Sequence, residues 1–151
     1  MKPASNNLVV ACAILLAGCM NGSNPDSSVD GVYALNKKPE VRMEFKEGRW
    51  RSLGPKPGNP AILEIRQFGT FTRKDDYLVV EIIWFGDFNK ARKDEQSVMY
   101  FKLHGDGLTE DRTEFYEHGG LIHTHTPPAP RNDYTKVQGK LPPVDESFLP
   151  L

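Results

Sequence analysis

Apolar and polar residues alternate along much of this chain, and that alternation restricts the fold most strongly. The clearest run is 41–46, in which Val, Met and Phe alternate with Arg, Glu and Lys. Successive side chains of a β-strand point to opposite faces, so this pattern is typical of a strand with one buried face. Residues 86–97 are the only candidate helix, but they lack an apolar stripe, which favours a polar hairpin loop. The alternation therefore predicts an all-β fold.

Turn residues divide the alternating segments into seven or eight expected strands. A glycine at position 69 falls inside one of these segments, where it predicts a bulge or a bend. Strands separated by turns every 8–12 residues or so are typical of antiparallel meanders. We expect a small antiparallel barrel or sandwich. The turn signals are Glu47-Gly48, Lys74-Asp75-Asp76, Gly105-Asp106-Gly107 and Gly119-Gly120.

Three further segments carry specific expectations. Residues 77–85 are nearly all β-branched or aromatic, which predicts a central strand covered on both faces. Residues 54–60 hold three prolines, and we interpret them as a stiff surface loop between two strands. We expect a short last strand at residues 133–137.

Length, charge and motif content exclude several classes of function. A chain of 151 residues allows one domain, and a net charge of −1 gives no electrostatic case for binding nucleic acid. No nucleophile motif or glycine-rich phosphate loop is present, so we expect no catalytic residues and no enzymatic activity. Glu64 and Glu81 could form a hydrolase-like pair, but ion pairs with Arg66 and Arg73 are the simpler interpretation.

The N-terminus has the organisation of an export signal. A start with one basic residue, Lys2, is followed by an apolar run over 8–17 that is too short to span a bilayer. Leu16-Ala17-Gly18-Cys19 then resembles the lipobox of bacterial lipoproteins. The resemblance implies that Cys19 carries lipid on its thiol and becomes the new N-terminus. Several acyl chains would anchor the protein stably, whereas one would not.

This resemblance implies a domain organisation and a location. We expect a signal peptide over 1–18, a flexible tether over 19–30, a β domain over 31–137 and a proline-rich tail over 138–151. In lipoproteins of this kind an Asp after the lipidated cysteine retains the protein at the inner membrane. The residue here is Met20, so the resemblance implies an outer-membrane anchor with the domain facing the periplasm.

The start of the β domain shows a second, shorter resemblance. Gly31-Val32-Tyr33 is similar to the opening Gly-x-Trp/Tyr of lipocalin-like domains, in which the aromatic residue plugs one end of the barrel. The resemblance implies a lipocalin-like meander. The chain is short for a full lipocalin and shows no closing helix.

The histidines form the sharpest chemical cluster. His123 and His125 are two apart on an expected strand, so their imidazoles share one face at a separation of roughly 6.5–7 Å. His118, across the Gly119-Gly120 turn, could add a third nitrogen. Such a site would take zinc or copper; without it no cofactor is expected. A solvated polar hairpin is the alternative interpretation.

Three functions remain open from the sequence. The first is a non-enzymatic, membrane-anchored binding or accessory protein, whose partner is an envelope protein or a small ligand. The second is a metal-binding or metal-sensing lipoprotein that uses His118, His123 and His125. The third is a carrier of an apolar ligand inside a lipocalin-like barrel.

Overall fold

The structure, a computed structural model, describes residues 29–85 and 95–147. These residues form β-strands joined by turns and irregular segments, and none of them belongs to a helix that could cross a membrane. The strands are β1 (Gly31–Leu35), β2 (Lys38–Lys46), β3 (Arg49–Lys56), β4 (Asn59–Lys74), β5 (Tyr77–Phe85), β6 (Glu95–His104), β7 (Gly107–Glu117), β8 (Gly120–His125), β9 (Asp133–Val137) and β10 (Val144–Asp145).

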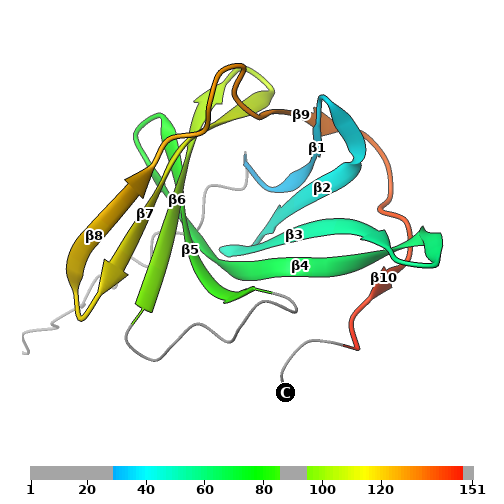
Figure 1. Cartoon of the computed structure of the whole chain (residues 1–151). Coiled ribbons are helices and arrows are strands. Elements are labelled where there is room, and N and C mark those ends of the chain that lie inside the picture. The colour runs from blue at the N-terminus through cyan, green and yellow to red at the C-terminus, as the bar shows by residue number, and fades with distance from the viewer. Residues whose placement is uncertain (1–28, 86–94, 148–151) are drawn as a thin grey trace, which may run out of the picture.

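Eight of these strands close into an antiparallel barrel (Figure 1). β1 to β7 pair in chain order as a meander, β9 follows β7, and β1 pairs with β9 to complete the ring. This confirms the expected all-β meander. It also decides between barrel and sandwich, because an open pair of sheets would leave the β1–β9 and β4–β5 edges unpaired.

The strand that closes the barrel is interrupted. β8 pairs with the second half of β7 and β9 pairs with its first half, so the two lie along the same edge of β7. Residues 126–132, rich in proline, separate them. β9 is needed for closure, whereas β8 lies outside the ring in a hairpin that projects from the barrel (Figure 1). The predicted strand at 133–137 is confirmed as β9, but it is not the last strand, because β10 follows it.

A bulge allows the longest strand to serve two neighbours. β4 pairs with β3 over 59–70 and with β5 over 67–74, and the register with β5 shifts between Phe68 and Gly69. An added Cβ at Gly69 would lie 1.9 Å from the backbone oxygen of Glu81. Only glycine permits this approach of two backbones, which explains the predicted bulge.

Aromatic and aliphatic side chains fill the barrel. Phe45 and Phe101 are fully buried, and the Phe45 ring makes edge-to-face contacts with Tyr33, Phe71 and Phe101 at centroid distances of 5.1–6.3 Å. Tyr33 donates a hydrogen bond from its hydroxyl to the carbonyl of Val29 at 3.0 Å. The lumen therefore holds the protein's own core, including the aromatic residue of the lipocalin-like opening.

A second, smaller core lies outside the lumen. Leu53, Leu63 and Ile65 are buried on the β3–β4 hairpin, and Leu141 and Val144 pack against them. β10 pairs in parallel with β4, and Leu63 donates its backbone N–H to the carbonyl of Pro143. Part of the expected proline-rich tail thus covers an apolar surface of the domain.

Two local expectations were wrong. Residues 54–60 form a tight hairpin and not a loop, since β3 continues to Lys56 and β4 starts at Asn59. The β2–β3 pairing ends at Leu53, so prolines beyond it cost no hydrogen bond on that side. β5 was expected to be covered on both faces, but Glu81 and Ile83 on its outer face are exposed.

Candidate functional site

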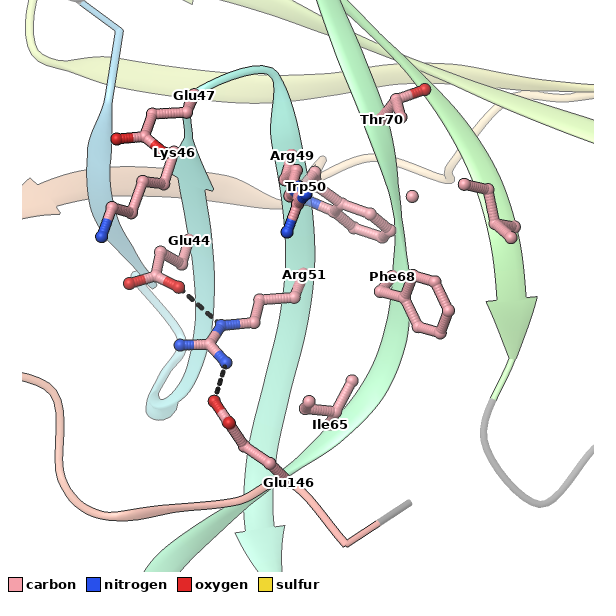
Figure 2. A pocket seen from close by; sticks show the side chains of 12 residues that line it. Glu44, Lys46, Glu47, Arg49, Trp50, Arg51, Ile65, Phe68, Thr70 and Glu146 are labelled. Carbon is pink, nitrogen blue, oxygen red and sulfur yellow. Dashed lines mark hydrogen bonds and ion pairs between the residues drawn. The ribbon is translucent and has the colours of Figure 1, made fainter. Parts of the chain in front are cut away.

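A pocket in the described structure lies on the barrel wall, over β2, β3, β4 and β5 (Figure 2). Side chains alternate along these strands, so Glu44 and Arg51 face outward where the neighbouring Phe45 and Trp50 belong to the lumen core. The pocket has a volume of about 520 Å³. Its lining residues are Glu44, Lys46, Glu47, Arg49, Trp50, Arg51, Ile65, Phe68, Gly69, Thr70, Ile83 and Glu146.

Arg51 organises the charged side of this wall pocket. Its guanidinium donates to Glu44 at 2.5 Å and to Glu146, just beyond β10, at 2.9 Å (Figure 2). Burial alone would lower the pKa of Arg51, but the hydrogen bonds to Glu146 and Glu44 outweigh it and raise the pKa. Arg51 therefore stays charged and ties the C-terminal segment to the barrel wall.

Apolar side chains and one unsatisfied donor form the rest of the wall pocket. Ile65 and Phe68 come from β4, and Ile83 is 51% exposed on β5. Trp50 is buried, and its indole Nε1 has no hydrogen-bond partner in the described structure. A buried N–H without an acceptor costs about 1–3 kcal/mol, so this indole is a local cost to stability and not an exposed donor.

A second polar cluster covers the outer face of β6 and β7. Glu114 accepts hydrogen bonds from the hydroxyls of Tyr100 and Tyr116, at 2.8 and 2.6 Å, and from Arg112 Nε at 2.8 Å. Arg112 also lies over the Tyr100 ring, 3.7 Å from its centroid. Every polar group of this cluster has a partner, which is the arrangement of a structural network.

The Glu114 cluster shifts the pKa values of its members. Burial alone would raise the pKa of Glu114, but the hydrogen bonds from Tyr116, Arg112 and Tyr100 outweigh burial and lower it. The hydrogen bond to the Glu114 carboxylate raises the pKa of Tyr116 to about 12. A smaller pocket of about 280 Å³ borders Tyr100 and Tyr116 on this face.

The predicted metal ligands lie on the projecting β7–β8 hairpin. His123 and His125 are opposite Phe115 and Thr113 of β7 and share one face, as expected. The His123 ring stacks on Phe115 with a centroid distance of 5.9 Å. His118 lies in the turn with a positive φ of 51°. Within residues 29–85 and 95–147, no three His, Cys, Asp or Glu side chains are grouped to hold a metal ion. Metal binding by these histidines stays a prediction.

The carboxylate pair that the sequence left open does not form. Glu64 is opposite Gly54 and makes an ion pair with Arg66 at 2.9 Å, whereas Glu81 is opposite Thr70 and accepts a hydrogen bond from Gln96. The register shift at Gly69 and the length of β4 keep the two carboxylates apart. Cys19 and the preceding signal segment lie outside the described residues, so lipidation also stays a prediction.

The sequence did not indicate the wall pocket. Its residues come from four strands, from the turn between β2 and β3 and from the segment after β10, and Glu146 lies 95 positions from its partner Arg51. A signal existed in the alternation, since Lys46, Arg49 and Arg51 are outward charges beside the buried Phe45 and Trp50. Which neighbours would complete a pocket depended on the strand order. The chain matches no protein-family model, no curated protein and no solved structure.

Proposed function

We propose that this protein is a lipid-anchored, non-enzymatic binding protein of the bacterial envelope. Leu16-Ala17-Gly18-Cys19 supports the anchor, because it combines small residues before a cysteine with a preceding apolar run. The polar segment over 21–30 would serve as the tether between the membrane and the barrel. Met20 in place of Asp favours the outer membrane, with the barrel in the periplasm.

The wall pocket carries the proposal of a binding role. The lumen is filled by core side chains, so a carrier of an apolar ligand has no space inside the barrel and is not proposed. The wall pocket instead offers Phe68 and Ile83 beside Arg49 and Arg51. Aromatic residues and Arg are enriched in protein interfaces.

The chemistry of this pocket selects the kind of partner. Apolar side chains from β4 and β5 lie next to cations and carboxylates of β2 and β3. A segment of an envelope protein that presents an apolar side chain and an adjacent charge would fit these groups. We infer that such a protein is the partner, in preference to a small ligand.

Photo-crosslinking of the full chain in intact cells tests this function. A photoreactive residue in place of Ile83, at the pocket rim, is expected to give one discrete protein adduct, whereas the same residue in place of the exposed Lys38 gives none. Charge reversal by Arg49→Glu should abolish the adduct without unfolding the barrel, because Arg49 is exposed. Absence of an adduct at Ile83, or an equal adduct at Lys38, would overturn the proposal.

Metal binding is a second candidate function. One observation favours it, namely that His123 and His125 project from the same face of an exposed strand. Two imidazoles from one chain are fewer than the three or four protein ligands that zinc sites in proteins use.

A further inference from the structure

β8 is an unprotected edge strand. It pairs with β7 on one side, and the described part of the chain gives it no strand on the other. All six of its residues are exposed, including Leu121 at 56% and Ile122 at 61%. Edge strands usually carry Lys, Pro or a bulge that prevents pairing with another chain. β8 contains neither Lys nor Pro, and its one register shift against β7 leaves out Ile122, so that residues 123–125 stay in regular pairing.

The chemistry of β8 points to a second copy of the same strand. An uncharged strand does not repel its own copy, and two β8 strands can pair in antiparallel orientation about a two-fold axis. If the axis passes through Thr124, His123 of each chain lies opposite His125 of the other. The prolines at 127 and 128 end the pairing at Thr126, so this register pairs residues 122–126 of the two chains.

We propose that two chains pair through β8 in this register and bind one Zn²⁺ ion between them with the four imidazoles of His123 and His125. Within one strand, the Cα atoms of His123 and His125 are roughly 6.5–7 Å apart. Across the two strands, residues opposite each other have Cβ atoms about 4.5–5.5 Å apart. Four nitrogens converging from such a rectangle suit the tetrahedral preference of zinc. Each chain alone supplies half of the site.

The metal and the strand pairing depend on each other. A two-stranded contact of about five residues is marginal in water, so the pairing alone would not hold two barrels together. Stacking on Phe115 restrains the His123 ring of each chain. This inference extends the metal-binding candidate and is independent of the wall pocket.

Zinc titration of the detergent-solubilised full chain, followed by sedimentation and native mass spectrometry, tests the site. We expect a monomer that becomes a dimer with one zinc per two chains and reverts when a chelator is added. His123→Ala and His125→Ala should each abolish the dimer. His104→Ala is the control that keeps it, since His104 lies on β6 and hydrogen-bonds with Thr109.

Three results would overturn the shared site. One is a chain that stays monomeric in an excess of zinc. Another is a monomer that binds zinc and needs His118 to do so, which would support the single-chain metal site in place of the shared one. A dimer that survives the double variant His123→Ala/His125→Ala would also contradict the proposal. Circular dichroism of each variant should match the parent, because these side chains are exposed.

A disulfide scan tests the register separately from the metal. Thr124 faces its own copy across the proposed axis, so Thr124→Cys should cross-link two chains when zinc is present and the thiols are oxidised. Ile122→Cys is the matched control, because in this register its copies are separated by four residue positions, about 13 Å. The unsubstituted chain is the background control, because it shows how much cross-linking occurs through the native cysteines. Cross-linking at position 122 and not at position 124 would refute the register.

Discussion

At the scale of single residues, Gly69 is the position where the β4–β5 seam tolerates no side chain. A Cβ there would lie 1.9 Å from the Glu81 oxygen and 2.9 Å from its carbonyl carbon, and both are backbone atoms that cannot rotate away. Gly69→Ala should therefore destabilise the barrel by more than about 2 kcal/mol in chemical denaturation. Gly120→Ala is the control, because its nearest atom is 3.5 Å away. Equal stability of the two variants would contradict this role for Gly69.

Glu114 gives a second prediction at this scale. Its carboxylate raises the pKa of Tyr116 to about 12 by accepting the hydroxyl proton in a hydrogen bond. In Glu114→Gln the charge is lost, so Tyr116 should ionise closer to the ordinary tyrosine pKa of about 10. Ultraviolet titration of the phenolate measures this shift, and Tyr116→Phe assigns the signal. An unchanged titration in Glu114→Gln would show that the hydrogen bond does not control Tyr116.

The same carboxylate makes stability depend on pH in a defined direction. The pKa of Glu114 is lower in the folded protein than its ordinary value. Its contribution to stability is therefore complete above the unfolded pKa, near 4.3, and is lost as the pH falls through the folded pKa. From neutral to acidic pH, the melting temperature should fall less steeply for Glu114→Gln than for the parent. A steeper fall for the variant would contradict the expected direction of this pH dependence.

At the scale of elements, the segment with β10 should stabilise the β3–β4 hairpin and not the lumen. Leu141 and Val144 cover Leu53 and Leu63, and Lys56 forms an ion pair with Asp145 at 2.5 Å. Deletion of residues 141–151 should speed hydrogen exchange across 53–65 and leave exchange across 78–82 slow. Deletion of 148–151 alone is the control. Uniform loss of protection would mean that the two cores unfold together.

The sequence predicted elements whose cause is local. Alternation predicted the strand around Phe45, glycine predicted the bulge at position 69, and the strand expected at 133–137 matches β9. Elements that depend on distant partners were not predictable. Exposure of the outer face of β5 and covering of Leu53 by Leu141 follow from strand order and from contacts across some 90 positions. The wall pocket belongs to this second group, whereas the shared face of His123 and His125 follows from strand periodicity alone.

At the scale of the whole molecule, Phe45 links the strands of the barrel. Its ring contacts Tyr33 of β1, Phe71 of β4 and Phe101 of β6, and it is fully buried. Phe45→Ala should cost about 3–5 kcal/mol in the free energy of unfolding, from lost burial and from the cavity left behind. Denaturant titration measures the loss. The exposed Ile83→Ala should cost much less, and a comparable loss there would contradict a single lumen core.

Membrane attachment is also a property of the whole molecule, and it depends on one thiol. If Cys19 carries the lipid, Cys19→Ala should abolish incorporation of a labelled palmitate. The chain should also leave the washed membrane fraction, because stable anchoring needs the several acyl chains that this cysteine would carry. Met20→Asp separates anchoring from sorting. It should keep the label and shift the protein from the outer to the inner membrane on a density gradient. Labelled Cys19→Ala would place the lipid elsewhere, and unchanged sorting of Met20→Asp would remove the argument for the outer membrane while leaving the anchor intact.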